Sequence, residues 1–195
     1  MEPNETQWLY RLLSADGWAS LNEDLRAFHQ AGPQSIAEGV FKVIRGPGLL
    51  GRMAAAMLKA PPAGEKIPIK LVIDRSTREG QPFERWARSF DGFPVPTDQY
   101  PVDPWLVERA GLIEVAMNVT THNGELRFTE AWVALRLGQL RLKMPSLFTP
   151  RIRGEQAARS SNRLWTSVDV AMPLLGSFIH YEGEIVVSER PSPQK

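Results

Sequence analysis

The sequence predicts an α+β fold, in which N-terminal helices pack on a large curved antiparallel β-sheet or open barrel within a single domain. Apolar residues near the N-terminus recur at helical spacing. After residue 65 they alternate with a period of two, as in strands that bury one face. Asn, Gly and Pro residues separate these alternating segments. Strands joined by short turns after a helical start are typical of this fold class.

The composition fits one globular domain and excludes several functional classes. The 195 residues are 43% hydrophobic and 23% charged, which are ordinary values for a folded chain. The net charge of +1 is unlike that of a nucleic-acid-binding protein, so no nucleic-acid partner is expected. The lack of cysteine excludes disulfides, thiolate metal ligands and a cysteine nucleophile. Because we recognise no signal peptide or membrane-spanning segment, we expect a cytoplasmic protein without stable membrane insertion.

Two helices are predicted at the start of the chain. The first covers residues 8–13, where the apolar side chains have helical spacing. The second begins with a capping-box pattern at residues 20–23 and ends at residues 31–33, Ala-Gly-Pro. A short strand over residues 40–45 is followed by a third candidate helix over residues 49–59, which a proline-rich stretch closes.

About eight antiparallel strands are predicted in total. The segment 94–104 holds four prolines and is predicted to be an irregular loop, because proline cannot donate to a strand ladder. Asn123-Gly124 is a strong signal for a hairpin turn. In the strand after it the apolar residues change sides, which predicts a bulge near Ala131. Besides 40–45, the predicted strands cover residues 67–73, 84–90, 106–121, 126–137, 140–144, 168–172 and 177–187.

The domain is expected to span residues 1–187. Residues 188–195 are polar and include two prolines, so we expect a disordered tail there. No repeat, low-complexity tract or linker divides the chain.

A set of motifs runs through the chain in a defined order. The motifs are Gly39-x5-Arg45-Gly46, Pro61-Pro62-Ala63-Gly64, Trp86-x-Arg88-x-Phe90, Glu108-x-x-Gly111, Pro145-x-Leu147-x-x-Pro150, Leu174-Leu175-Gly176 and Tyr181-x-Gly183. In their order and spacing, the chain from about Leu9 to Ile185 resembles the domain of unknown function 4166 family of bacterial proteins. The resemblance implies a domain that occurs alone, or C-terminal to saccharopine-dehydrogenase-like or short-chain-dehydrogenase-like domains. A dehydrogenase is therefore a candidate partner. Glu184 stands where the resemblance leads us to expect a bulky aromatic residue.

Several catalytic and metal-binding signatures are absent from the sequence. The three histidines do not form a His-x-x-x-His or Glu-x-x-His pair, so no metal site or cofactor is predicted. Neither a phosphate-binding glycine motif nor a Gly-x-Ser-x-Gly nucleophile motif is present. The basic residues between 151 and 163 are interpreted as a solvated edge, since Trp165 is the only aromatic residue near them. We therefore predict no catalytic residues.

The candidate ligand-binding residues centre on one strand. Trp86, Arg88 and Phe90 alternate, so their side chains share a face. If that face is internal, Arg88 needs a carboxylate partner, which Glu84 or Glu108 could supply. Arg88 is then either a polar anchor for a ligand head group or half of a structural ion pair on which Trp86 stacks. The full candidate set is Arg45, Trp86, Arg88, Glu108 and Tyr181.

Three other features have both a functional and a structural interpretation. On the last strand only one of His180 and Tyr181 can face inward, and Tyr181 is the better candidate for the core. His29 ends the second predicted helix, where a charged histidine suits the helix dipole. The segment 49–58, rich in Leu and Met, is either a lid or membrane-touching helix that admits an apolar ligand, or a helix packed in the core.

Three functional hypotheses follow. The first is a non-catalytic module that binds a hydrophobic or lipid-like small molecule in a cavity of the sheet, and it is preferred because no catalytic motif is present. The second is an accessory or catalytic domain that acts with a dehydrogenase, in which Arg88, Glu108 and Tyr181 converge on one pocket. The third is an oligomerisation or interaction module that uses a sheet edge or the 49–58 helix. The oligomeric state is left open.

Overall fold

The computed structural model describes residues 8–47, 60–173 and 176–188, and within these ranges it contains three short helices and eleven strands. The helices are α1 (Trp8–Leu12), α2 (Ala15–Ser20) and α3 (Glu23–His29). The strands are β1 (Gln34–Arg45), β2 (Gly64–Arg78), β3 (Gln81–Phe90), β4 (Phe93–Val102), β5 (Trp105–Ala110), β6 (Ile113–His122), β7 (Glu125–Leu137), β8 (Leu140–Lys143), β9 (Arg151–Ser160), β10 (Arg163–Met172) and β11 (Gly176–Val187).

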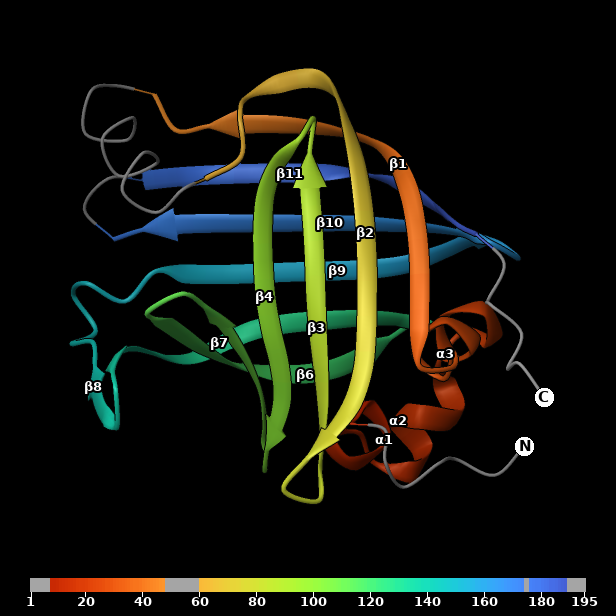
Figure 1. Ribbon diagram of the computed structural model, residues 1–195, viewed down its shortest axis with the longest axis horizontal. Coiled ribbons are helices and arrows are strands. Elements are labelled where there is room, and N and C mark those ends of the chain that lie inside the picture. The colour runs from red at the N-terminus through yellow and green to blue at the C-terminus, as the bar shows by residue number, and fades with distance from the viewer. Residues whose placement is uncertain (1–7, 48–59, 174–175, 189–195) are drawn as a thin grey trace.

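Ten of these strands close into a barrel (Figure 1). Each strand pairs antiparallel with the next in the ring β1-β2-β3-β4-β5-β6-β7-β9-β10-β11, and β11 pairs with β1. The expected large antiparallel sheet with N-terminal helices is therefore present, but the terms α+β and open barrel are not correct in detail. The fold is a mostly-β, closed barrel, and its helices are short.

Strand β7 closes the ring. It pairs with β6 along most of its 13 residues. On its other side, Leu126–Thr129 pair with β9, whereas Ala134–Leu137 pair with β8. Among the described residues β8 pairs with β7 alone, so it lies outside the ring of ten strands. Closure rests on the short pairing between β7 and β9, which the pattern of alternation does not reveal.

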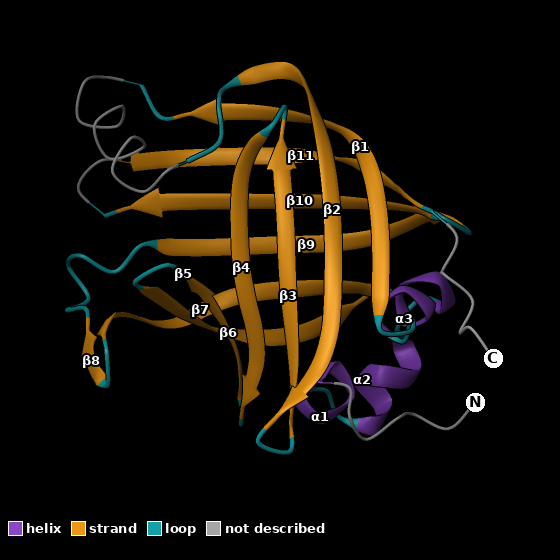
Figure 2. Ribbon diagram, viewed as in Figure 1, coloured by secondary structure: helices purple, strands orange, loops and turns teal. Residues whose placement is uncertain are grey.

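The three helices lie together at one end of the barrel (Figure 2). Helix α1 contacts β4 and β5, α2 contacts β6, and α3 contacts β9. Their apolar side chains, including Trp18, Leu25 and Phe28, are buried in the same core as the strands. The helices are thus held in place by burial of apolar surface against the barrel, since helices of five to seven residues are not stable alone.

The helix boundaries differ from the predicted capping box at residues 20–23. An additional helix, α2, begins after Ser14, whose Oγ accepts a hydrogen bond from the Gly17 amide at 3.0 Å. Ser20 ends that helix. Helix α3 is capped by Asn22 instead, whose Oδ1 accepts from the Asp24 amide at 2.8 Å. Both residue types cap helices, and the short connection between α2 and α3 moves the cap two positions along the chain.

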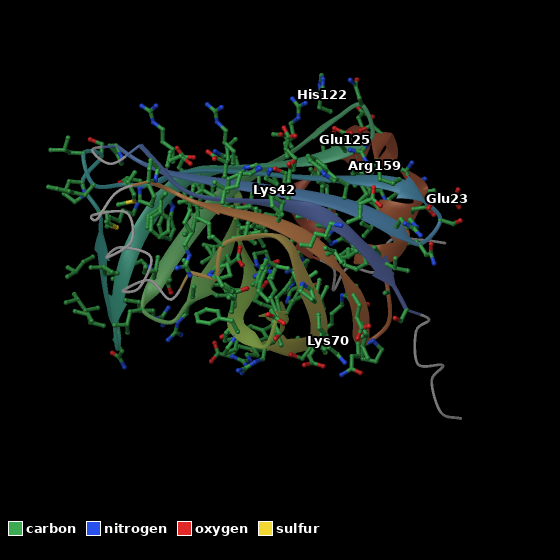
Figure 3. All side chains as sticks on the ribbon, turned by 90° about the horizontal axis from the view of Figure 1, so that it is seen from above. Glu23, Lys42, Lys70, His122, Glu125 and Arg159 are labelled. Atoms are coloured by element: carbon green, nitrogen blue, oxygen red, sulfur yellow. The ribbon has the colours of Figure 1, made fainter. Side chains whose placement is uncertain are left out.

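Side chains on the strands alternate between the core and the surface. Leu71 and Ile73 of β2 and Phe90 of β3 point into the barrel and are almost fully buried. Charged side chains such as Lys70 and Arg159 lie on the outside (Figure 3). This alternation agrees with the predicted period of two, and it makes the inside of the barrel the main core of the protein.

Glycines at the β1–β11 junction allow the two strands to lie unusually close together. A β-carbon on Gly39 would overlap the carbonyl oxygen of Glu184, and one on Gly46 would overlap the carbonyl oxygen of Ser177. Gly183 has the Phe41 ring packed over it. Three glycines of the sequence motifs are therefore needed for strand packing.

The hairpin turns follow their sequence signals. Asn123 and Gly124 have φ values of +51° and +81°, so the predicted turn between β6 and β7 is confirmed. Glu79 and Gly80, with φ values of +51° and +76°, make a similar turn between β2 and β3. The predicted bulge near Ala131 is also present, because the register between β6 and β7 shifts there.

The prediction of an irregular loop over residues 94–104 is wrong. Most of this segment is strand β4, and a cis peptide bond precedes Pro104 in the turn to β5. The pairing with β5 covers only Asp98–Val102, so Pro94 and Pro96 lie where the edge of β4 is free. Proline is tolerated at such positions because no ladder partner is lost there.

Three further differences concern the extent of the elements. The predicted strand over 106–121 is two strands, β5 and β6, divided at Gly111, which has a φ of +59°. Strand β9, in the segment interpreted as a basic edge, was not predicted. The predicted helix over 49–59 and most of the predicted tail lie outside the described residues.

Candidate ligand-binding site

A cavity of about 100 Å³ lies inside the barrel. Trp86 and Arg88 reach it from β3, Gln99 from β4, Glu108 from β5, Gln156 from β9 and Tyr181 from β11. Residues far apart in the sequence meet here because the ring of strands brings β3, β5 and β11 around one interior. Four of the five predicted ligand-binding residues, Trp86, Arg88, Glu108 and Tyr181, line this cavity.

An ion pair between Arg88 and Glu108 forms the polar part of the wall. Arg88 Nη1 donates to Glu108 Oε1 at 2.9 Å and to Thr97 Oγ1 at 2.8 Å. The guanidinium carbon lies 4.9 Å from the centre of the Trp86 ring, within the range of a cation–π contact. The two side chains are only 15% and 23% exposed, so the pair is largely withdrawn from solvent. The carboxylate partner expected for Arg88 is therefore Glu108, and the same pair faces the cavity.

Each member of the pair keeps the other charged. Burial acts to lower the pKa of Arg88, but the Glu108 carboxylate outweighs it and the pKa stays above its usual value. Burial acts to raise the pKa of Glu108. The charge of Arg88 and hydrogen bonds from Thr97 and Gln99 outweigh that effect, so the pKa of Glu108 is lowered. Both groups are thus ionised at neutral pH, and their charges cancel.

Tyr181 brings a neutral hydroxyl to the same wall. Burial raises the pKa of this phenol, so it remains protonated and is able to donate a hydrogen bond. Its ring packs against Phe41 and Phe90, with centroid distances of 6.1 and 5.6 Å. The prediction that Tyr181 faces inward is confirmed. His180, its neighbour, lies 3.8 Å from both Asp169 and Glu182.

A second ion pair supports the first from the side of the helices. Arg75 Nε donates to Glu84 Oε1 at 3.1 Å, and the other oxygen of Glu84 accepts from Trp86 Nε1 at 2.8 Å. Arg75 also donates to the carbonyl oxygen of Phe28, near the end of α3. Glu84 is therefore committed to Arg75 and Trp86, which leaves Glu108 as the partner of Arg88.

His29 lies at the edge of the cavity and is not charged at neutral pH. Burial lowers its pKa to about 4, although Glu84 and a hydrogen bond with Gln156 act in the opposite direction. The hydrogen bond joins His29 Nε2 and Gln156 Oε1 at 2.7 Å. The expectation that His29 favours the helix dipole as a cation is thus wrong, because the last turn of α3 is buried against β9.

The rest of the wall is mainly apolar. Leu106, Met117, Phe128 and Val168 line it, and each comes from a different strand. Gly154 lies opposite Phe128, where a β-carbon would come within 3.3 Å of the ring. Glu155 also lines the cavity, and its carboxylate is paired with Arg127 at 3.5 Å. The cavity thus combines an apolar wall with a few hydrogen-bonding groups whose charges are paired, which is the usual character of a small-molecule site.

The fifth predicted residue, Arg45, is not part of this site. Its guanidinium donates to the carbonyl oxygens of Pro61 and Ala60 at 2.8 and 2.5 Å. Arg45 therefore fixes the chain that leads into β2. This contact also explains why Arg45 and the Pro61 segment occur together among the sequence motifs.

Sequence reasoning missed His29, Thr97, Gln99 and Gln156 as parts of the site. Thr97 and Gln99 fall inside the segment predicted as a loop, which hid their alternation toward the interior. His29 and Gln156 are separated by 127 positions, and no local pattern links them. Of these four residues, only Gln156 had a recognisable signal in the sequence. It lies in the segment 152–158, where apolar or small residues occupy alternate positions as in a strand with one buried face.

The described residues lack two kinds of feature. They contain no group of three or more His, Cys, Asp or Glu side chains placed to hold a metal ion. No helix among them has the length and apolar character needed to cross a membrane.

Comparison with known proteins agrees with the resemblance seen in the sequence motifs. A family model described as a domain of unknown function (DUF4166) matches residues 21–185. Searches of curated proteins and of solved structures returned no match.

Proposed function

The chain belongs to the DUF4166 family, and we propose that it binds a hydrophobic or lipid-like small molecule inside the barrel without transforming it. One observation carries the proposal: an apolar interior cavity has the buried Arg88–Glu108 pair and the Tyr181 hydroxyl on its wall. An apolar wall with a few converging polar groups favours a ligand that has an apolar body and one polar group.

The charge balance of the wall favours a neutral polar group on the ligand. Arg88 is paired with Glu108, Glu155 is paired with Arg127, and His29 is neutral at pH 7. A carboxylate or ammonium ion would be buried without a counter-ion, at a high cost in free energy. A hydroxyl, carbonyl or amide would be able to hydrogen-bond to Tyr181 or Gln99 without this cost.

The size of the cavity limits what it can enclose. At about 100 Å³ it is smaller than the roughly 300–1,000 Å³ of pockets that enclose drug-sized ligands. We therefore propose that it takes a compact molecule, or one end of a longer one.

The wall is poorly suited to proton transfer, which supports binding over catalysis. A general base at neutral pH needs a pKa near 7. The pKa of Glu108 is lowered by its contact with Arg88, and the pKa of His29 is about 4. Neither group is tuned to that task. A cytoplasmic location, as expected from the sequence, completes the proposal, and cell fractionation would test it.

Displacement of a neutral apolar dye, read by fluorescence, tests this function. 1-Hexanol should displace 2-naphthol, a compact two-ring fluorophore, at lower concentration than hexanoate does. Met117→Trp should fill the cavity and abolish dye binding, whereas Val40→Trp, at an exposed position, should not. Circular dichroism would verify that both variants fold. Unchanged dye binding by a folded Met117→Trp protein, or a preference for the acid, would contradict the proposal.

A further inference from the structure

The β7–β8 hairpin projects from the barrel at the end away from the helices (Figure 1). It consists of the last residues of β7, a turn at Gly138-Gln139, and β8. All four residues of β8 are exposed. The hairpin is followed by the exposed residues 145–148, which lead toward β9.

One face of this hairpin is built from leucines. Leu135 pairs with Leu142 and Leu137 pairs with Leu140, so the four side chains lie on the same side of the two strands. Their exposed fractions run from 40% to 55%, and Leu147 and Phe148 beyond the hairpin are 55% and 52% exposed. Six of the ten large apolar residues that are exposed in the described part of the chain fall in this short stretch. Such a cluster marks an interaction surface.

The leucine face continues the inner face of the barrel. Val115 packs against the barrel core, and its neighbour in the register is Val133 on β7. Leu135 lies two residues further along β7, on the same side, opposite Ile113. Apolar surface therefore runs from the inside of the barrel to the tip of the hairpin.

The opposite face of the hairpin is basic. Arg136 and Arg141 pair across the two strands, and both contact Glu114, at 2.7 and 2.6 Å. Lys143 lies beside them, with its Nζ 5.2 Å from the Trp132 ring centre. The carboxylate of Glu114 is fully buried beneath the two arginines, so it offsets one of the three positive charges.

The surrounding chain is also basic. Residues 131–154 hold five of the 23 basic residues of the protein and none of its 22 acidic residues. The rest of the chain therefore carries a net negative charge, and the cations are concentrated where the apolar side chains are exposed.

We propose that the leucines and cations of residues 135–148 dock the protein on the surface of an anionic lipid bilayer. Exposed apolar side chains that enter the interface, and Lys and Arg on the other face that attract anionic head groups, are the two elements of peripheral membrane binding by an amphipathic segment. Docking leaves the barrel outside the bilayer and requires no spanning segment. The proposal goes beyond ligand binding in the cavity and is independent of it.

Charge argues against an edge-to-edge pair of chains on this surface. Two copies joined through the free edges of β8 would bring Arg141 and Lys143 of both hairpins together on one face of the joined strands. Like charges at close range oppose such pairing, and charged edge strands are a common means of preventing it.

Vesicle co-sedimentation of the full chain tests the proposal. The protein should bind phosphatidylcholine vesicles that contain phosphatidylglycerol, and it should bind pure phosphatidylcholine vesicles weakly. Binding should weaken as salt is added, because the cations act through screened attraction. Equal binding to both vesicle types, or no effect of salt, would overturn the role of charge.

Matched variants separate the two contributions. Lys143→Gln should reduce partitioning about fivefold, whereas Lys66→Gln, at an exposed lysine on β2, should have no effect. The double variant Leu140→Gln, Leu142→Gln should reduce it by at least about tenfold. The control is Val40→Gln, Ile44→Gln, because both residues are comparably exposed on β1.

The thermal midpoint of each variant would show that it folds. Wild-type binding by the folded leucine variant would overturn the proposal. Concentration-dependent dimerisation that the leucine variant abolishes would assign the surface to self-association instead. Dye binding in the cavity is measured without vesicles, so failure of the cavity proposal would not be mistaken for failure of docking.

Discussion

Arg88 and Glu108 form an ion pair along the inner wall of the barrel, with 2.9 Å between Nη1 and Oε1, and the pair lines the interior cavity. They come from β3 and β5, which are separated in the ring by β4. The pair therefore links two strands that do not hydrogen-bond to each other. Its strength bears on both the stability of the barrel and the electrostatic character of the site.

Glu108→Gln should destabilise the protein, because it leaves Arg88 buried without a counter-ion. We expect a loss of about 2–4 kcal/mol, somewhat below the value for a fully buried pair because both side chains retain some exposure. Urea denaturation would measure it. Glu184→Gln, in an exposed pair with Arg163, should cost under about 1 kcal/mol. The double variant Arg88→Leu, Glu108→Leu should recover most of the loss, and equal losses in the double and single variants would contradict this view.

His29 should make the protein less stable as the solution becomes acidic. Its folded pKa of about 4 lies below the unfolded value of 6.5, so the unfolded chain takes up a proton first as the pH falls. The contribution is complete above pH 6.5. It is lost between pH 6.5 and about 4, at up to about 1.4 kcal/mol per pH unit.

A comparison of His29→Gln with wild type isolates this effect from that of the carboxylates. The free energy of unfolding of the variant should fall less steeply over this pH range, while that of His122→Gln, at an exposed position, should follow wild type. Identical slopes for His29→Gln and wild type would show that His29 is not held neutral.

Gly39→Ala should destabilise the protein by about 1–3 kcal/mol, because the new methyl group would overlap the backbone of β11. The obstructing atom is a carbonyl oxygen of Glu184, so no side-chain rotation relieves the overlap. Gly32→Ala provides the control, since a β-carbon there meets nothing within 4 Å. Thermal unfolding of both variants would measure the difference, and similar midpoints would contradict the close approach of β1 and β11.

Glu114→Gln should loosen the β7–β8 hairpin without opening the barrel. Glu114 accepts hydrogen bonds from Arg136, Arg141 and Tyr100, and these hold the hairpin against β6. Loss of its charge should cost about 1–3 kcal/mol. Hydrogen exchange should accelerate in residues 134–143 and remain slow in β2 and β3. Uniform acceleration in all strands would indicate global rather than local destabilisation.

The alternation of side chains was sufficient to predict the part of the site that lies on single strands. Trp86, Arg88 and Phe90 share the inner face as their spacing requires, and the need of a buried Arg88 for a carboxylate was correctly inferred. The sequence left Glu84 and Glu108 both open as that carboxylate, and the structure assigns Glu84 to Arg75 and Glu108 to Arg88. The inferences that succeeded depend on geometry within one strand and on the cost of an unpaired charge.

Closure of the barrel could not be predicted in the same way. Closure depends on which strand pairs with Leu126–Thr129 on the side away from β6. The alternation of side chains is equally compatible with an unpaired edge there. Four prolines in or next to residues 93–102 concealed that this segment is a strand. Proline is tolerated in a strand where no neighbouring strand needs its missing N–H, and the sequence does not show that β5 leaves part of β4 unpaired. Both errors concern long-range pairing, about which local sequence carries little information.

The position of β8 outside the ring has a consequence for how the chain can change. The ring is completed by the pairs between Leu126–Thr129 and β9, before β7 reaches its turn into β8. The barrel and the projecting β7–β8 hairpin are therefore separate structural units that share one continuous strand, β7. The hairpin could be shortened, extended or exchanged, and with it the surface that the protein recognises, while the walls around the cavity stay intact.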